Sequence, residues 1–280
     1  MNILSVDFED WYHPQLVQRY LDGKKKEPSV INGLDKILDL LRRNDTYATF
    51  FVVGELLEYK PEILDKIIGQ GHEIGFHTMH HTRLDSPGFK EKFQDEIVEF
   101  ANLTSKRSKG FRAPTFSLNY ESAWAVNLLA DHDYAYDSSI MPVKTSMYGF
   151  SNAEKRPYKI SSRSLEKEDL EGRLLEFPLL TGSFLGRKIP TAGGFYIRFF
   201  PLGVIKKSII EYEKKEIPAT FYIHSWELTP EFMPKITMSI KDAFITYHKI
   251  VKTLTKLEEL LKNFKFTSFN RYISNSNLQV

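Results

Sequence analysis

The 280-residue sequence contains no cysteine, no marked excess of one charge sign and no long hydrophobic run. Without cysteine, disulfide scaffolds and thiolate metal sites are excluded. The 38 basic and 36 acidic residues leave a formal net charge of +2, which does not indicate a nucleic-acid partner. No run of about 18 apolar residues could span a membrane, and the first residues do not form a basic and apolar leader. These absences predict a soluble, cytoplasmic protein without a transmembrane segment, and they leave peripheral attachment to a membrane open.

Hydrophobic residues are common instead, at 42% of the chain, and aromatic residues reach 14%. At a length that can bury a sizeable core, this composition indicates a globular, enzyme-like body with an aromatic-lined groove. No linker or change in composition divides the chain. We therefore expect a single domain over residues 1–272, followed by a polar tail at 273–280.

Short apolar runs alternate with helical patterns along most of the chain. Helices are predicted over residues 30–41, 61–68, 89–103, 120–129, 202–212 and 243–261, and strands over 2–8, 47–53, 73–76, near 111, 134–137, 174–177, 219–224 and 264–269. Repeated βα units predict an α/β fold with a parallel sheet or barrel, whose functional residues collect at the carboxyl ends of the strands. Residues 141–200 are less regular and are expected to form an insertion across the mouth of the barrel.

Three of the eight histidines fall within five residues, directly after the strand predicted at 73–76. Two of them, His77 and His81, are four residues apart, so on a helical turn their imidazoles would share a face and could bind one divalent cation. A metal hydrolase needs such a pair together with a carboxylate and an open position for water. The carboxylate must come from another part of the chain.

The first predicted strand ends in three carboxylates, Asp7, Glu9 and Asp10. Acidic residues are depleted in strands, so this cluster calls for an explanation. In an extended strand Asp7 and Glu9 point to the same side, and Asp10 follows as the chain turns away. The functional interpretation is a catalytic base beside a metal-binding carboxylate, and the alternative is a helix N-terminus or a solvated loop.

Two further polar motifs follow predicted strands, Arg112-Ala113-Pro114-Thr115 and Tyr222-Ile223-His224. In this order, the motifs resemble those of the polysaccharide deacetylase family, the NodB-homology or carbohydrate esterase family 4 enzymes. The pair at 77 and 81 is similar to that family's His-(Ser/Thr)-x-x-His motif, and the other two to its Arg-x-Pro and Leu-x-His motifs. Residues 6–11, 136–139 and 221–227 most resemble the subgroup of exopolysaccharide loci that carries the DUF3473 region.

The resemblance implies a distorted (β/α)7-type barrel of the NodB-homology fold. It also implies hydrolysis of the acetamido group of an N-acetylated sugar, in a polysaccharide or in a lipid- or nucleotide-linked precursor. One bound divalent metal ion, usually Zn2+, would assist the reaction. Oligomeric state is not indicated by the sequence.

The resemblance also implies roles for individual residues. His77 and His81 would be metal ligands, Arg112 would pair with the catalytic base, and His224 would be the acid that protonates the leaving amine. Asp137 is the candidate to orient and charge that acid. Candidates for substrate contact are Trp11, Pro114 and Trp226.

This chain departs from the family pattern of two adjacent aspartates, because its carboxylates are spread over Asp7-Phe8-Glu9-Asp10. Either Asp7 is the base and Glu9 the metal ligand, or Glu9 is the base and Asp10 the ligand. Strand alternation favours the first pairing and a gapless alignment favours the second, so both remain open here.

Two other functions are compatible with the motifs. One is a C–N hydrolase acting on a small cyclic amide, as in allantoinase-like or imidase-like relatives of the fold. The other is a catalytically inactive barrel that only binds glycans. The joint presence of Asp7, Arg112 and His224 favours an enzyme, because a binding protein has no use for all three.

Overall fold

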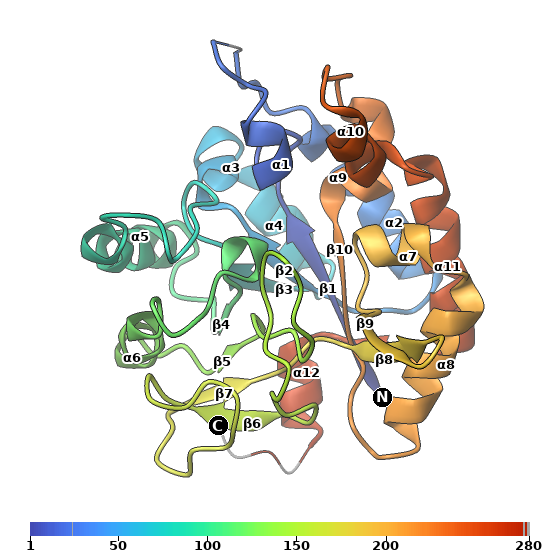
Figure 1. Cartoon of the computed structure of the whole chain (residues 1–280). Coiled ribbons are helices and arrows are strands. Elements are labelled where there is room, and N and C mark those ends of the chain that lie inside the picture. The colour runs from blue at the N-terminus through green and yellow to red at the C-terminus, as the bar shows by residue number, and fades with distance from the viewer. Residues whose placement is uncertain (24, 277, 279–280) are drawn as a thin grey trace.

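The structure is a computed structural model that describes residues 1–23, 25–276 and 278, and its centre is a curled, mainly parallel sheet surrounded by helices (Figure 1). In spatial order the parallel strands are β10 (Thr220–His224), β1 (Asn2–Phe8), β2 (Thr49–Val52), β3 (Glu73–Phe76), β4 (Gly110–Phe111), β5 (Tyr136–Asp137) and β7 (Leu174–Glu176). The edge strand β6 (Tyr158–Ile160) runs antiparallel to β7, and β11 (Phe266–Thr267) pairs with the start of β1.

The sheet closes on itself through the residues that follow β7. Leu179 forms a parallel bridge with Thr220 of β10, and the backbone N–H of Leu180 donates to the carbonyl of Thr220 at 3.0 Å. The barrel is irregular, because two of its strands, β4 and β5, are only two residues long. The fold is therefore the distorted (β/α)7 barrel that the sequence predicts.

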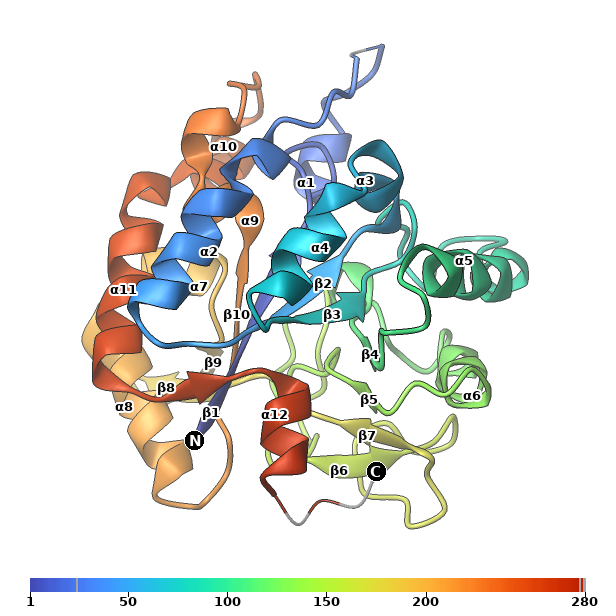
Figure 2. The same cartoon turned by 180° about the vertical axis from the view of Figure 1, so that it is seen from behind.

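Helices cover the outside of the barrel, as Figures 1 and 2 show from opposite sides. The longer ones are α2 (Leu34–Arg43), α4 (Glu62–Gly69), α5 (Lys90–Leu103), α6 (Trp124–Asp131), α8 (Leu202–Glu213) and α11 (Thr253–Asn263). Shorter elements are α1 (Gln15–Gln18), α3 (Gly54–Tyr59), α7 (Phe195–Phe199), α9 (Ser225–Leu228), α10 (Ile240–Tyr247), α12 (Phe269–Ser274) and the 3-10 turns at 30–33, 114–116, 230–232 and 250–252. In Figure 1, α1, α3, α9 and α10 lie at the end toward which β1 points, and α12 lies toward the other end.

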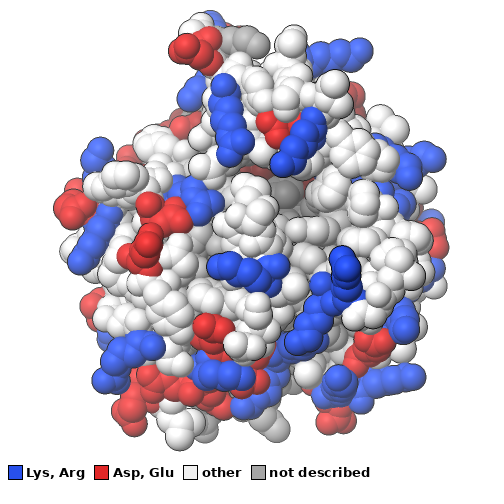
Figure 3. Space-filling view, in the orientation of Figure 1, with Lys and Arg blue, Asp and Glu red and all other residues white. Residues whose placement is uncertain are grey.

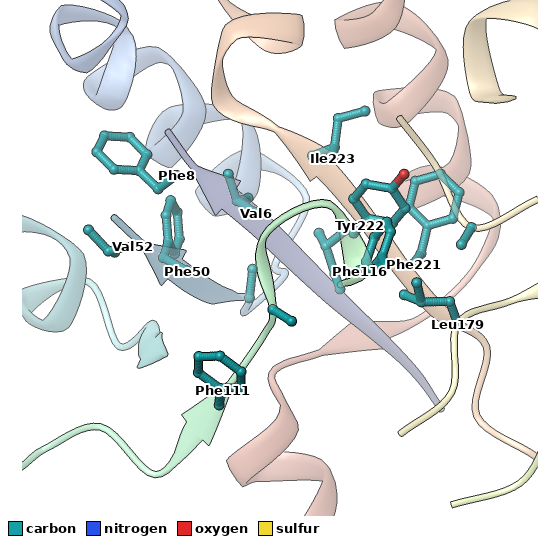
Figure 4. Close-up of a cluster of buried hydrophobic side chains, with 14 of the residues drawn as sticks. Val6, Phe8, Phe50, Val52, Phe111, Phe116, Leu179, Phe221, Tyr222 and Ile223 are labelled. Carbon is teal, nitrogen blue, oxygen red and sulfur yellow. The ribbon is translucent and has the colours of Figure 1, made fainter. Parts of the chain in front are cut away.

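Alternation along the strands produces two apolar layers. The outer layer packs strand side chains such as Phe8, Phe50 and Val52 against the helices (Figure 4). Inside the barrel, Phe51 and Tyr136 pack against Phe269 of α12, in a cluster with ring centroids 5.7 and 4.7 Å from the Phe269 ring. Burial of each such ring stabilises the fold by about 1.5–3 kcal/mol. Because α12 fills the amino-terminal end of the barrel, the carboxyl ends of the strands are left for a site.

The helix predicted over residues 243–261 is wrong in extent. The chain instead forms α10, a 3-10 turn (Ile250–Lys252) and then α11. Lys249 has a φ of 48°, in the left-handed region, so it cannot continue α10 and redirects the chain. The strand predicted at 264–269 is shortened to β11, because the hydroxyl of Ser268 accepts a hydrogen bond from Arg271 N and starts α12 at Phe269.

The region predicted as irregular, 141–200, contains more regular structure than expected. Besides β6 and β7, it holds the hairpin of β8 (Thr181–Phe184) and β9 (Arg187–Pro190), which turns at Leu185 and Gly186 with φ of 49° and 76°. At the other end of the chain, α12 extends to Ser274, and residues 277, 279 and 280 of the expected tail lie outside the described residues. No described helix is both long and apolar enough to cross a membrane.

Candidate functional site

Side chains from the carboxyl ends of several strands surround a cavity of about 310 Å³. Asp7 and Glu9 come from the end of β1 and from just beyond it, and both line the cavity, as strand alternation predicts. His77 follows β3 directly, and His224 is the last residue of β10. Asp7 and His224 are register partners in the β1–β10 pairing, so two residues more than 200 positions apart are adjacent.

The loop that carries His77 and His81 is not helical, so the expected helical turn is wrong. Thr78 and His81 have φ of 58° and 55°, and these left-handed residues fold the chain back on itself. Gly54 N donates to the Thr78 carbonyl at 3.0 Å, and a Cβ at Gly54 would lie 2.1 Å from the Met79 sulfur, so glycine lets the Met79 side chain pack against the start of α3. The imidazoles nevertheless converge, with ring centroids 4.9 Å apart.

Glu9, His77 and His81 each offer one potential metal-ligating atom, and these three atoms all lie within 4.8 Å of one another. Nδ1 of His77 is hydrogen-bonded to the carbonyl of Arg112 at 2.7 Å, which leaves Nε2 available. Burial lowers the pKa of His77 to about 4, so at neutral pH this ring is uncharged and able to bind a cation. The set contains one carboxylate and two imidazoles, a combination that suits Zn2+.

The Glu9 side chain is buried, and in the described structure only one of its two carboxylate oxygens accepts a hydrogen bond. Its Oε1 accepts a hydrogen bond from Trp226 Nε1 at 2.8 Å. Its Oε2 lies 2.7 Å from Nε2 of His81, yet makes no hydrogen bond within the described part of the chain. Burial would raise the pKa of Glu9, but His81, His224 and His77 hold it below its usual value. A charged carboxylate with an oxygen directed at two imidazoles is the arrangement that a divalent cation would complete.

Asp10 points away from this cluster. Its Oδ1 accepts from Trp11 N at 2.9 Å, and its Oδ2 accepts from Ser29 N at 2.9 Å and Ile31 N at 3.2 Å. The carboxylate thus anchors the turn at residues 30–33. Of the two pairings left open by the sequence, the geometry favours Asp7 with Glu9.

Arg112 lies beneath Asp7 and is fully buried. Its Nη1 donates to Asp7 Oδ1 and to Ser5 Oγ, both at 2.7 Å, and Nε and Nη2 donate to the carbonyl and hydroxyl of Ser138 at 2.8 Å. The guanidinium also lies 4.3 Å from the centroid of the Phe51 ring. These contacts fix the orientation of the Asp7 carboxylate.

His224 is held by Glu227 and Arg198. Its Nδ1 is hydrogen-bonded to Glu227 Oε2 at 2.7 Å, and Arg198 Nε donates to Glu227 Oε1 at 2.8 Å. The remaining Arg198 donors bond the carbonyls of Ile245, Thr246 and His248 at the end of α10. Burial alone would lower the pKa of His224, but Glu227, and then Glu9 and Asp7, raise it to about 9. The ring can therefore carry a donatable proton at neutral pH.

Asp137, which the sequence suggested as the partner of His224, lies elsewhere. Its Oδ1 accepts from Ser139 Oγ at 2.6 Å, and it is the register partner of Glu176 in the β5–β7 pairing. Burial raises the pKa of both Asp137 and Glu176, so one proton shared between the two carboxyl groups would satisfy the pair. The structure thus gives the contact with His224 to Glu227, three residues further along the chain.

Of the three candidates for substrate contact, only Trp226 lines the cavity in the described structure. Trp226 lines the cavity and stacks on His224 with centroids 5.2 Å apart and planes at 19°. Trp11 is buried in a second apolar cluster, and Pro114 is buried in a 3-10 turn. Neither of them is among the residues that line the cavity in the described structure, whereas Phe116, two residues after Pro114, is.

The rest of the cavity wall is aromatic and comes from segments without a motif. Tyr148 and Tyr196 face each other with their hydroxyls 3.3 Å apart, and Phe195 and Met147 lie beside them. Arg198 in this wall is the one charged residue of the otherwise apolar α7. On the face shown in Figure 3, basic and acidic side chains are intermixed with uncharged ones.

Comparison with known families divides the chain in two. Residues 26–136 match the model of the family described as polysaccharide deacetylase, and residues 138–274 match the domain of unknown function DUF3473. The boundary between the matches falls within β5. His77, His81 and Arg112 lie in the first region, His224, Glu227 and Arg198 in the second.

Curated relatives and solved structures agree with these matches. The chain is 27% identical over 151 residues to the peptidoglycan-N-acetylmuramic acid deacetylase PdaA of Bacillus subtilis, which covers 42% of this chain and 57% of the relative. It is 33% identical over 87 residues to a peptidoglycan-N-acetylglucosamine deacetylase of Bacillus cereus, which covers 30% of this chain and 40% of the relative. The chain thus spans about half the length of these relatives.

A crystal structure of a candidate polysaccharide deacetylase from Mycobacterium smegmatis has a similar fold. The TM-score is 0.57 at 15% identity, over 98% of this chain and 90% of that one. At such low identity the similarity concerns the fold alone.

Proposed function

We propose that the chain, which matches the polysaccharide deacetylase model over residues 26–136, is a metal-dependent N-deacetylase that hydrolyses the acetamido group of an N-acetylated sugar. The observation that carries this proposal is the Glu9, His77 and His81 cluster on the wall of the cavity, with Asp7 and His224 in the same cavity. A base, an acid and a cation site in one cavity are the components that hydrolysis of an amide requires.

Glu9, His77 and His81 would hold one divalent ion, and their donor set of one carboxylate and two imidazoles suits Zn2+. Such an ion, when bound, supplies Lewis-acid activation of water and polarisation of the amide carbonyl. The chain prepares the site by keeping His77 neutral, through burial, and Glu9 charged, through its imidazole neighbours. Trp226 fixes the other oxygen of Glu9 by donating from its indole N–H.

Asp7 is the proposed base, which takes a proton from the attacking water. Arg112 holds its Oδ1 at 2.7 Å, and the guanidinium is in turn fixed by Ser5 and Ser138. Because Arg112 is fully buried, the pair is shielded from solvent and its geometry is maintained. The carboxylate is thus oriented toward the cavity before substrate arrives.

His224 is the proposed acid, which donates its Nε2 proton to the departing amine. Glu227 binds Nδ1 and so directs Nε2 toward the cavity, where Glu9 Oε1 lies 3.8 Å away. Arg198 orients Glu227 in turn, and Trp226 stacks on the imidazole. The acid is therefore positioned by side chains on α7 and α9 as well as on its own strand.

The substrate would be an N-acetylated glycan, in a polysaccharide or in a lipid- or nucleotide-linked precursor. Aromatic walls formed by Phe116, Tyr148, Tyr196 and Trp226 suit the apolar faces of sugar rings. Arg198, the one cationic lysine or arginine among the described cavity residues, has its donors committed to Glu227 and to backbone carbonyls. This favours an uncharged sugar at the reacting position.

We also propose that the region matched by DUF3473 is part of the same single domain. It contributes β7, β10 and β11, of which β10 and β11 pair with β1 at the beginning of the chain. It would supply the acid and most of the aromatic wall, so the first 25 residues and the two matched regions would together form one catalytic unit over residues 1–272.

The test is metal content, measured on wild-type protein and on the His77→Ala and His81→Ala variants. We expect about one ion per chain in the wild type and none in either variant. The metal-loaded enzyme should then release acetate from acetylated oligosaccharides, and His224→Ala should bind the oligosaccharide without turning it over. A wild-type protein that takes up no metal even after reconstitution would overturn the proposal, and turnover of allantoin in place of any oligosaccharide would assign it to the cyclic amide hydrolases.

A further inference from the structure

An apolar surface on α7 and α10 is not explained by the proposed chemistry. Phe199, Ile240 and Phe244 are exposed at 46%, 93% and 45%, and we call these three residues the α7–α10 face. Phe199 and Phe244 contact each other with ring centroids 6.4 Å apart, and Ile240 lies one helical turn before Phe244. Single exposed apolar residues are ordinary on a protein surface, but a packed group of them indicates an interaction site.

The face continues the wall of the cavity. Phe195, which lines the cavity, stacks on Phe199 with centroids 5.3 Å apart and planes at 26°, and lies 6.2 Å from Phe244. Ile245 of α10 lines the cavity as well. Whatever covers the α7–α10 face therefore lies at the mouth of the cavity, beside the entering substrate.

Basic residues are frequent in the segment that contains α10. Residues 235–256 contain the five lysines Lys235, Lys241, Lys249, Lys252 and Lys256, and only one acidic residue, Asp242. The carboxylate of Asp242 is occupied by the hydroxyl of Tyr20 at 2.6 Å. Four of the lysines, all but Lys256, are exposed and have no carboxylate within 4.0 Å among the residues that the structure describes. In Figure 3, basic side chains are prominent at the upper right, where Figure 1 places α10.

We propose that the α7–α10 face docks on a lipid bilayer that contains anionic lipids. An apolar ridge flanked by lysines is the composition of interfacial helices, whose apolar residues enter the acyl boundary while the lysines remain among the headgroups. A protein partner fits less well, because lysine is depleted in protein interfaces and three apolar side chains are far fewer than such interfaces use. Bilayer binding itself does not depend on the proposed function.

Docking in this way has a consequence that does rest on the proposed function. The mouth of the cavity would face the membrane surface, because Phe195 and Ile245 connect the α7–α10 face to the cavity wall. Among the substrates left open above, a glycan attached to a lipid anchor would then be favoured, since its sugar would be presented at the depth of the cavity mouth.

The experiment is co-sedimentation of the full chain with vesicles of phosphatidylcholine alone and with vesicles that contain phosphatidylglycerol as well. We expect binding to the anionic vesicles only, weakened by salt. Each lysine near an anionic surface contributes roughly a fivefold gain in affinity, so Lys241→Glu together with Lys249→Glu should weaken binding by about 25-fold or more. Ile240→Asp should weaken it by about tenfold, because the largest exposed aliphatic side chain of the face is lost.

Matched control variants carry the same changes at other exposed positions. Leu170→Asp replaces an apolar side chain that is 83% exposed, and Lys214→Glu with Lys215→Glu reverses two exposed lysines after α8. We expect both controls to bind vesicles like the wild type. Three outcomes would each overturn the proposal. The control variants would lose as much vesicle binding as the variants of the face, the wild type would bind neutral vesicles as well as anionic ones, or the wild type would bind no vesicles.

Two further measurements separate the remaining explanations. Light scattering that finds a dimer dispersed by Ile240→Asp would show that a second copy of the chain covers the face, which contradicts the proposal. Acetate release from a soluble oligosaccharide should be unchanged in Ile240→Asp. If the wild type releases acetate but does not bind vesicles, the docking proposal fails alone, and if it binds vesicles but releases no acetate, the proposed function fails alone.

Discussion

The choice between Glu9 and Asp10 as the metal-binding carboxylate can be tested with two matched substitutions, Glu9→Gln and Asp10→Asn. Each keeps the size of the side chain and removes its charge. Some residues contact a metal ligand without binding the metal themselves. Loss of such a residue lowers metal affinity by about 10- to 100-fold. Glu9 offers an oxygen within 4.8 Å of the ligating atoms of two imidazoles, so loss of its carboxylate should lower metal affinity by more than that. We therefore expect Glu9→Gln to weaken zinc binding by over 100-fold and Asp10→Asn to leave it almost unchanged.

Asp10→Asn should instead destabilise the fold. The carboxylate accepts three backbone hydrogen bonds, at 2.9, 2.9 and 3.2 Å. Hydrogen bonds to charged groups contribute about 1.5–3 kcal/mol each, and an asparagine amide would turn its N–H2 toward at least one of these donors. The expected loss is about 2–4 kcal/mol in the free energy of unfolding, which corresponds to a Tm lower by roughly 3–7 °C for a chain of this size.

Thermal unfolding with and without zinc measures both effects. An ion at 100 times its Kd stabilises the folded state by about 2.7 kcal/mol, so zinc should raise the Tm of the wild type and of Asp10→Asn. Adding zinc should leave the Tm of Glu9→Gln unchanged. Calorimetric titration gives the Kd values for zinc directly. The reasoning is refuted if Asp10→Asn loses zinc binding while Glu9→Gln retains it, because Glu9 would then be the base and Asp10 the ligand.

Three other predictions follow from individual contacts. Glu227→Gln should lower kcat by about 10²- to 10⁴-fold without loss of metal, because His224 loses the partner that orients and charges it; steady-state kinetics with metal analysis checks this. Arg112→Lys should destabilise the fold by about 3–5 kcal/mol in urea unfolding, because an ammonium cannot replace the buried guanidinium fork. Gly193→Ala should cost about 3 kcal/mol or more, since its Cβ would lie 1.6 Å from a carbonyl oxygen of β10, whereas Gly203→Ala, with open space in α8, should be neutral or slightly stabilising in the same assay.

The barrel was predictable because its strands are short apolar runs with clear boundaries. The predicted strands at 2–8, 73–76 and 219–224 differ from β1, β3 and β10 by at most one residue at either end. Burial on both faces of a parallel sheet produces such runs, whatever lies between them. Predictions of helix extent failed where the backbone conformation of a single residue decides the structure. Apolar spacing continues through Lys249, so nothing in the pattern reveals its left-handed φ.

The histidine loop illustrates a correct outcome reached through a wrong mechanism. Spacing of four residues suggested a helical turn, but Thr78 and His81 adopt positive φ instead. Non-glycine residues store strain in this conformation, and such strain is concentrated at functional sites. Side-chain convergence at 4.9 Å between the His77 and His81 rings therefore depends on the supporting contacts from α3, which no local pattern encodes.

Partners that come from distant parts of the chain could not be read from the sequence. The contact between His224 and Glu227 is local, and its three-residue spacing could have suggested it. Arg198 is different, because its bonds to Glu227 and to the end of α10 join segments 29 and about 50 residues apart. A lone arginine in an apolar helix signals that its charge is compensated, but does not identify the compensating group.

The position of the proposed catalytic groups supports the proposal that the two matched regions act together. The proposed base and cation site come from β1 and from the loop after β3, whereas the proposed acid ends β10, which pairs with β1 residue for residue from Ile3 to Asp7. Asp7 and His224 are therefore held at a fixed separation by a backbone ladder, and a rigid ladder positions catalytic groups more accurately than loops do. If the region matched by DUF3473 were an accessory to a complete deacetylase, β1 would need another neighbour on that side and the site another acid. In the described structure β10 fills both needs, which supports the proposal that the two matched regions belong to one domain.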